Sequence, residues 1–202
     1  QIYPYIDEEK WTEPKSSDVE EFCSRFGIKE GDRVILVVGR MDRVKSQDTA
    51  IKSLAPLVHK FKNLKLMLIG DGSFSGSTRG GLSLPKGVMW RYQLENLVRE
   101  LKLEDHVIFT GYLHDRLLKA AYKRAEVVVL PSVKEGFGLV VGEAWIYKKP
   151  VVVSRGAGAS EIVIERTNGY TFEPMNVGEL TEKLTWLLEN PEASMRMGER
   201  GR

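Results

Sequence analysis

Short runs of apolar, β-favouring residues alternate along this chain with longer segments whose apolar positions recur at helical spacing. The runs are nearly continuous in Val, Ile and Leu, which is typical of parallel strands buried on both faces. We expect strands over residues 34–38, 64–69, 107–109, 127–130 and 151–153. We expect helices over residues 47–61, 93–102, 115–124, 139–148 and 177–188. This alternation predicts an α/β fold, a doubly wound, Rossmann-like parallel sheet with right-handed crossovers.

Residues 70–90 interrupt the alternation. The segment is rich in Gly and Ser and is longer than a normal connection between a strand and a helix. It follows the second expected strand, at the edge where open α/β sheets bind ligands. A surface insertion is the simpler interpretation, and a substrate lid carrying Arg79, Lys86 and Trp90 is the alternative.

Both ends of the chain indicate a piece of something longer. The polar, proline-bearing residues 1–14 are typical of an interdomain linker. At the other end, Asn190 and Pro191 are a good N-cap and first residue for a helix that then stops abruptly. We therefore expect a linker over residues 1–14 and one domain over residues 15–202, with its last helix truncated.

Composition narrows the class of protein. Thirty Lys and Arg against 28 Asp and Glu leave a net charge of +2, which argues against a nucleic-acid-binding surface but permits a local basic site. The single cysteine, Cys23, rules out an internal disulfide and fits a reducing compartment. The chain has no run of 18 apolar residues and no signal-peptide pattern. We expect a cytoplasmic protein, and a peripheral membrane contact of a longer protein stays open.

The first candidate for chemistry follows the first expected strand. Gly39 lets the backbone turn tightly and approach a ligand. Arg40 offers a planar fork of donors to phosphate oxygens, and Lys45 adds a compact charge just before a helix. The alternative is that both cations are solvated surface charges.

The second candidate is the stretch from Pro131 to Ala144, PSVKEGFGLVVGEA. A Gly-rich turn follows the strand that ends at residue 130, and we expect a helix to begin near Gly138, where free N–H groups attract an anion. Glu135 and Glu143 flank that site, where carboxylates accept hydrogen bonds from sugar hydroxyls better than they bind phosphate. The alternative is a helix-start glutamate and a surface glutamate.

Two glutamates separated by seven residues in this setting resemble the signature of glycosyltransferase family four, also called group 1. The resemblance extends over nearly the whole chain, through Gly39-Arg40 and Lys45, GDG at 70–72, VIFTG at 107–111, PVVV at 150–153 and Asn168-Gly169. It implies the C-terminal, donor-binding domain of a GT-B enzyme, whose N-terminal domain binds the acceptor. It also implies a retaining, metal-independent hexosyltransferase that uses a nucleotide-diphosphate sugar, with the isolated domain inactive in transfer.

The resemblance assigns roles residue by residue. Arg40 and Lys45 hold the diphosphate and stabilise it as it leaves, Glu143 binds the ribose, and Glu135 lies against the transferred sugar. Tyr112 lies beside the nucleobase. The remaining contacts to the sugar and the phosphates come from Gly39, Gly136, Phe137, Gly138 and Leu139. The nucleotide sugar is a substrate, so we expect no cofactor. We expect no metal either, because the chain has no Asp-x-Asp and its three histidines lack ligand spacing.

Some residues depart from the family's pattern or favour plainer interpretations. Arg155 and Ala157 stand near the usual adjacent glycines, which puts the sugar specificity in question. We interpret Trp145 and Tyr147 as core residues and His114 as a surface residue. Two alternatives to a transferase stay open. One is an epimerase or phosphorylase of the same architecture, and the other is a non-enzymatic nucleotide-binding module, although no Gly-x-Gly-x-x-Gly follows the first strand.

Overall fold

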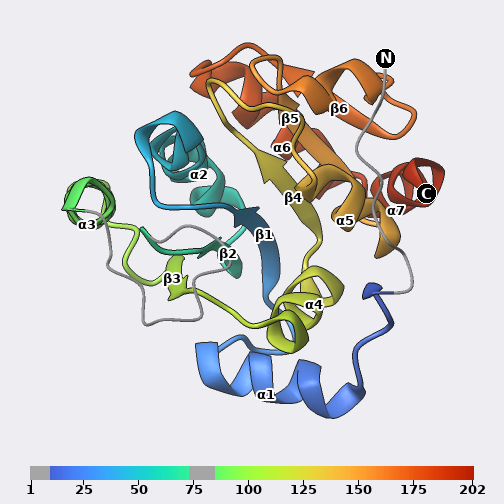
Figure 1. The fold of residues 1–202 in the computed structure, drawn as a ribbon, viewed down its shortest axis with the longest axis horizontal. Coiled ribbons are helices and arrows are strands. Elements are labelled where there is room, and N and C mark those ends of the chain that lie inside the picture. Colours follow the sequence, from blue (N-terminus) through green and yellow to red (C-terminus); the bar gives the residue numbers. More distant parts are fainter. Residues whose placement is uncertain (1–9, 73–84) are drawn as a thin grey trace.

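A computed structural model describes residues 10–72 and 85–202 of the chain. A parallel sheet of six strands, in the order β3-β2-β1-β4-β5-β6, crosses its centre (Figure 1). The strands are β1 (Arg33–Val38), β2 (Leu64–Ile69), β3 (Val107–Gly111), β4 (Val127–Leu130), β5 (Val151–Ser154) and β6 (Gly169–Phe172). The first five confirm the predicted strands, and the order is that of a Rossmann-like, doubly wound sheet. Strand β6 was not predicted; its four residues begin at Gly169, directly after a turn.

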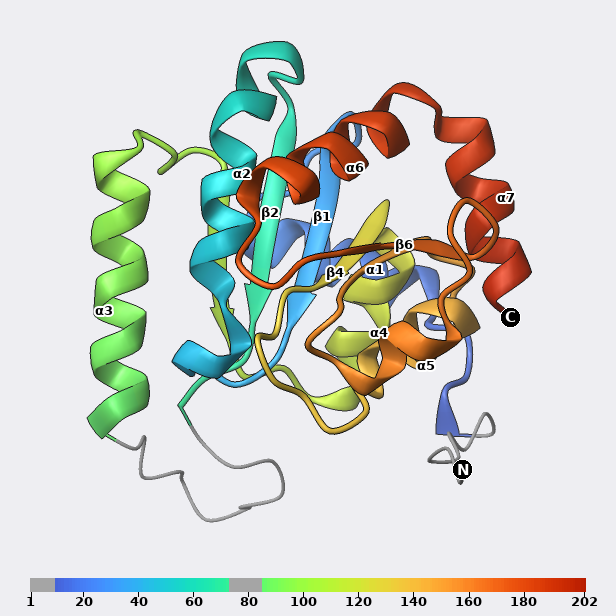
Figure 2. The same ribbon diagram turned by 90° about the horizontal axis from the view of Figure 1, so that it is seen from above.

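Helices cover both faces of the sheet (Figures 1 and 2). They are α1 (Ser16–Phe26), α2 (Gln47–Lys60), α3 (Pro85–Glu100), α4 (Asp115–Arg124), α5 (Val140–Ile146), α6 (Val177–Glu189) and α7 (Pro191–Gly201). Alternate residues of β1 enter two separate cores, because successive side chains of a strand point to opposite faces. Val34 and Leu36 pack with α1, α4 and α5. Ile35 and Val37 pack with α2, α3 and α6.

Helix α3 corrects the predicted extent of the loop after β2. It begins at Pro85, so the last six residues of the expected 70–90 insertion are helical, with proline at a position that tolerates its missing N–H. Trp90 packs against the core between sheet and helices, and its indole N–H donates to Gln47 Oε1 at 2.9 Å. This residue therefore fastens α3 to α2 and does not serve as a lid. Arg79 and the side chain of Lys86 lie outside the described residues.

The residues just before α1 pack on the domain. Trp11 meets the rings of Tyr122 and Tyr147 edge-on, with centroids 5.7 and 6.3 Å away. The Tyr147 hydroxyl donates to the Thr12 carbonyl at 2.9 Å. Tyr147 and Trp145 are only 6% and 8% exposed, which confirms their prediction as core residues. Within the described ranges, no helix combines the length and apolar character needed to cross a membrane.

Candidate functional site

The site lies where the strand order reverses. Strands β1 and β4 are neighbours, but the chain leaves β1 for a helix on one face and β4 for a helix on the other. Loops that diverge in this way leave a crevice at the carboxyl ends of the strands, where α/β proteins bind ligands. A cavity of about 680 Å³ opens there.

The cavity brings together residues that are far apart in the sequence. Nine sequence-predicted residues line it: Gly39, Arg40, Lys45, Tyr112, Glu135, Phe137, Gly138, Leu139 and Glu143. Gly136 lies beside them on the exposed surface of the loop. The wall also contains charged residues that the sequence analysis missed: Lys10, Asp71, Asp115 and Lys119. Asp115 and Lys119 stand one turn apart at the start of α4, but nothing in their local pattern indicates that this turn faces the end of β1.

Backbone contacts fix the loop after β1. The Gly39 N–H donates to the Ile69 carbonyl at 2.9 Å, and the Met41 N–H donates to Asp71 O at 2.7 Å. From the other side, the buried Gln47 side chain donates to the Arg40 carbonyl at 2.7 Å. The backbone of Arg40 is thus held between β2 and α2, which gives its side chain a rigid base at the cavity wall.

The loop after β4 rests on the loop after β5. Glu135 N–H donates to the Gly156 carbonyl at 3.1 Å, and Ala159 N–H donates to the Phe137 carbonyl at 2.6 Å. A Cβ atom at Gly158 would lie 2.2 Å from the Gly136 carbonyl oxygen, so only glycine allows the two backbones this close. Gly138 has φ +97°, which also favours glycine. These contacts hold Glu135 at the cavity.

Lys45 and Glu135 form an ion pair across the β1–β4 junction, although 90 positions separate them. Their side chains are 18% and 20% exposed. The Ser132 hydroxyl also donates to Glu135 Oε2, at 3.2 Å. The pair places a cation and a carboxylate in contact within one cavity, where the cation can meet a phosphate and the carboxylate a hydroxyl.

Glu143 has a different environment on α5. The Tyr122 hydroxyl donates to its Oε2 at 2.5 Å. Burial raises the pKa of the Glu143 carboxyl, and the negative charge of Asp115 acts in the same direction, whereas the Tyr122 hydrogen bond and Lys10 lower that pKa. Burial also raises the pKa of the Tyr122 hydroxyl, so the hydroxyl keeps its proton and remains the donor.

The start of α5 corrects the predicted helix over residues 139–148. The helix spans Val140–Ile146 and begins two residues after Gly138. The N–H groups of Val141 and Glu143 already donate to the carbonyls of Gly138 and Leu139. The first turn, whose N–H groups have no helical carbonyl to bind, therefore begins at Val140 rather than at Gly138.

Tyr112 also lines the cavity. Its side chain is 53% exposed and meets the ring of the exposed His114 edge-on at 5.3 Å. The exposure of His114 confirms its prediction as a surface residue. Among residues 10–72 and 85–202, no three His, Cys, Asp or Glu side chains gather closely enough to hold a metal ion.

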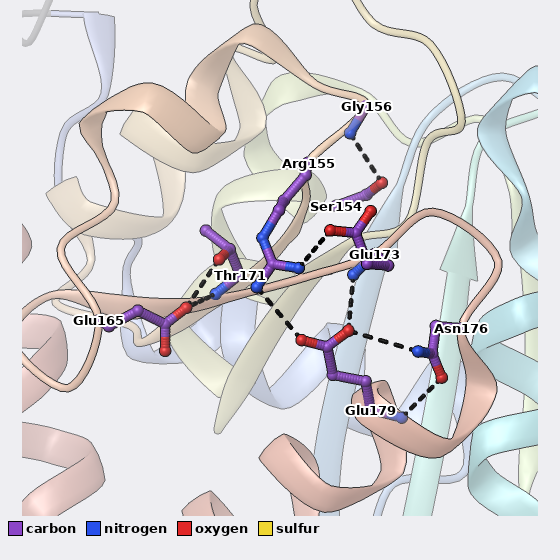
Figure 3. Close-up of polar contacts among 8 residues, drawn as sticks. All are labelled: Ser154, Arg155, Gly156, Glu165, Thr171, Glu173, Asn176 and Glu179. Atoms are coloured by element: carbon purple, nitrogen blue, oxygen red, sulfur yellow. Dashed lines mark hydrogen bonds and ion pairs between the residues drawn. The ribbon is translucent and has the colours of Figure 1, made fainter.

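Arg155 is not among the described residues that line the cavity, and its side chain points toward Glu173 and Glu179 (Figure 3). Its guanidinium contacts Glu173 at 2.7 Å and Glu179 at 3.2 Å. The Glu179 carboxylate also accepts a hydrogen bond from the Glu173 N–H at 2.8 Å, and Asn176 caps α6 by accepting from the Glu179 N–H at 3.0 Å. Ala157 is buried in the core beneath the loop. The two departures from the family's pattern thus anchor the loop that supports Glu135.

Fold and cavity together define a Rossmann-like domain with a ligand site at its topological switch point. The family model for glycosyl transferases group 1 matches residues 18–202, and the chain belongs to this family. An uncharacterised glycosyltransferase of Methanocaldococcus jannaschii is 33% identical over 155 residues, covering 77% of this chain and 35% of that protein. D-inositol 3-phosphate glycosyltransferase of Corynebacterium urealyticum is 30% identical, covering 98% of this chain and 45% of that enzyme. The chain thus spans less than half the length of these relatives.

Solved structures share the fold. The crystal structure of Anabaena HepE in complex with UDP and glucose has a TM-score of 0.82 and 24% identity, covering 99% of this chain and 50% of that one. The C-terminal domain of a glycosyl transferase group 1 family protein from Francisella tularensis has a TM-score of 0.81 and 23% identity. That match covers 98% of this chain and 94% of the Francisella domain, so the described part of the chain has the fold of one GT-B-type domain.

Proposed function

We propose that this chain is the donor-binding domain of a retaining glycosyltransferase that transfers a hexose from a nucleotide-diphosphate sugar without a metal ion. The observation that carries the proposal is the Lys45–Glu135 ion pair inside the switch-point cavity, which has Arg40 and Glu143 in the same wall. A site for a sugar nucleotide requires cations for the diphosphate and carboxylates for the hydroxyls, and this cavity offers both. The UDP and glucose in the complex of Anabaena HepE are consistent with such a ligand.

Arg40 and Lys45 are proposed to bind the diphosphate. As the glycosidic bond breaks, negative charge grows on the leaving diphosphate, and cations already aimed at it bind the transition state more tightly than the ground state. The two side chains supply the positive charge that a divalent metal would otherwise provide. A preorganised donor of this kind typically contributes on the order of 10²–10³ in rate.

The two glutamates are proposed to bind different parts of the donor. Glu143 lies on α5 next to Tyr122 of α4 and accepts hydrogen bonds from the ribose hydroxyls. Glu135 lies next to Lys45 and contacts hydroxyls of the transferred sugar, while Tyr112 lies beside the base. The backbone of residues 136–139 completes the contacts to the sugar and the phosphates. Because the chain spans less than half of its relatives, we further propose that a separate N-terminal domain binds the acceptor and that this chain alone transfers no sugar.

Ligand binding to the 202-residue chain tests the proposal. UDP, GDP, ADP and their glucose or mannose derivatives are screened by thermal shift, each with EDTA and with magnesium. We expect the nucleotides of one base to raise the melting temperature of the chain by several degrees at saturation, since a ligand bound to the native state alone stabilises it. The increase is expected to be the same with EDTA as with magnesium. No shift with any nucleotide would contradict donor binding, and a shift that EDTA abolishes would contradict metal independence.

Calorimetry with two variants then tests the roles of the glutamates. Glu143→Gln is expected to weaken the free nucleoside diphosphate and its sugar derivative by the same factor. Glu135→Gln is expected to weaken mainly the sugar derivative. Equal losses on both ligands from both variants would refute this division. Mass spectrometry of the nucleotide sugar after incubation detects an epimerised product, which would favour the alternative function.

A further inference from the structure

Tyr122 does not line the cavity itself, but its hydroxyl contacts Glu143, which does. The residue belongs to α4 and its side chain is fully buried. Its hydroxyl donates to Glu143 Oε2 at 2.5 Å. Among the described residues, it is the one hydrogen-bond donor to that carboxylate.

Aromatic packing fixes the Tyr122 ring. It stacks on Tyr147, with centroids 5.9 Å apart and planes at 7°. Trp11 closes over it edge-on at 5.7 Å. The Tyr147 hydroxyl is bound in turn to the Thr12 carbonyl at 2.9 Å. A ring held from several sides has no freedom to carry its hydroxyl away, so the position of the oxygen is set by packing.

We propose that Tyr122 is a positioning residue for donor binding: its hydroxyl fixes the Glu143 carboxylate so that the remaining oxygen lone pairs face the ribose hydroxyls. The inference rests on the proposed function, because it assumes that Glu143 binds the ribose. It adds a residue that touches neither substrate nor cavity and acts through Glu143 alone.

The choice of partner has a physical reason. A carboxylate accepts about four hydrogen bonds, and Tyr122 occupies one of these sites. A tyrosine hydroxyl is neutral, so the full negative charge of Glu143 stays available to a pair of sugar hydroxyls. A cation in the same place would neutralise that charge, as Lys45 does for Glu135.

The same contact favours the ionised form of Glu143. Burial and the negative charge of Asp115, at the start of α4, favour the protonated form of Glu143, whereas Tyr122 and Lys10 favour the carboxylate. Glu143 in turn contributes to the raised pKa of the Tyr147 hydroxyl. Removing the Tyr122 hydroxyl deletes a contribution that lowers the pKa of Glu143, so that pKa rises further. A protonated Glu143 accepts fewer hydrogen bonds, and nucleotide binding then fails at a higher pH than in the wild type.

The test compares Tyr122→Phe with Tyr147→Phe. Both variants keep the ring and its packing, and each removes one hydroxyl from the same aromatic group. Calorimetry measures the affinity for UDP, GDP and ADP across the pH range in which Glu143 titrates, and ¹³C NMR of the glutamate carboxyls follows that titration without ligand. Tyr122→Phe is expected to weaken the diphosphate that the wild type binds by about three- to tenfold at neutral pH. The pH at which half of the nucleotide affinity is lost and the pH at which Glu143 is half protonated (the binding midpoint and the Glu143 midpoint) are both expected to move to higher values.

Tyr147→Phe is expected to leave affinity and both midpoints unchanged. Equal losses in the two variants, or an unchanged Glu143 midpoint in Tyr122→Phe, would overturn the positioning role even if the wild type binds a diphosphate. A wild type that binds none of the three diphosphates would overturn the proposed function itself. In that case, a shifted Glu143 midpoint would still support the contact between the two side chains.

Discussion

Glu135 and Glu143 share one cavity but have opposite kinds of partner. Glu135 is paired with the cation Lys45 and accepts a second hydrogen bond from Ser132. Glu143 accepts a hydrogen bond from the neutral, fully buried Tyr122, and burial raises the pKa of its carboxyl. The first charge is compensated before any ligand arrives, and the second is not.

Under the proposed function, the two side chains are expected to respond differently to a donor. A diphosphate that binds Lys45 would remove a partner from Glu135, which would then be available to sugar hydroxyls. A ribose at Glu143 would add hydrogen bonds to a carboxylate that has few. We therefore expect donor binding to rearrange contacts on the β1 side of the cavity and to complete them on the α5 side.

The largest expected effect comes from Lys45→Ala. It removes a charge-assisted contact and leaves an uncompensated Glu135 facing the diphosphate. Affinity for the nucleoside diphosphate is expected to fall roughly 10- to 100-fold by calorimetry. The double variant Lys45→Ala with Glu135→Gln is expected to recover part of that loss, because the repelling charge is gone.

Lys52→Ala is the matched control for this experiment. Lys52 lies on α2, which follows Lys45 in the chain, and pairs with Asp48 at 2.8 Å on the surface. Its removal is expected to change affinity by less than about twofold. If the affinity loss of the double variant equalled the product of the losses from Lys45→Ala and Glu135→Gln, the two residues would act independently. The ion pair would then have no role in ligand binding.

A smaller effect is expected for the pH dependence of stability at Glu143. A carboxyl whose folded-state pKa is raised contributes stability below its unfolded pKa of about 4.3 and loses that contribution as pH rises through the folded value. Relative to Glu143→Gln, the wild type is therefore expected to lose free energy of unfolding as pH rises from about 4 towards 7. Urea denaturation of both proteins at several pH values measures this difference. A difference that grows in favour of the wild type with rising pH would show that Glu143 is stabilised as an anion.

The smallest effect is expected from Arg155→Ala. Arg155 is exposed, and ion pairs of this type contribute at most about 1 kcal/mol, so the melting temperature is expected to fall by roughly 2–4 °C. The melting temperature of Arg155→Lys is expected to lie between those of the wild type and Arg155→Ala, because one ammonium cannot reproduce the guanidinium fork that reaches both Glu173 and Glu179. Diphosphate affinity is expected to stay within about twofold. A large loss of affinity would mean that this anchor is rigidly coupled to Glu135.

Sequence alone predicted the parts of the molecule that local rules determine. The five apolar runs became neighbouring strands, and strand-end residues such as Gly39 and Glu135 were brought to one cavity because parallel strands end at the same edge. The family pattern pointed to these residues individually. Neither source indicated that Lys45 and Glu135 touch, since an ion pair across 90 positions depends on how two loops pack.

The remaining differences have physical causes. Helix α1 was missed because one fully buried side chain, Phe22, anchors a largely polar segment. The start of α3 was hidden because Pro85 and Gly87 are typical of loops as well as of helix starts. Tyr122 could be predicted to be buried, but its hydrogen bond to Glu143 depends on the relative rotation of α4 and α5.

The junction between β1 and β4 also has a consequence for how this domain folds. β1 registers with β2 over six residue pairs but with β4 over two, and the contact between β1 and β4 closes a loop of about 90 residues. Loop-closure entropy makes such pairings slow, so the local units can form before the two halves of the sheet join. The cavity exists only after that joining, because residues that follow β1 and residues that follow β4 both line it. A ligand bound in this cavity would stabilise the contact between the two halves of the sheet. A change in the refolding rate when the ligand is added would therefore show at which stage the two halves meet.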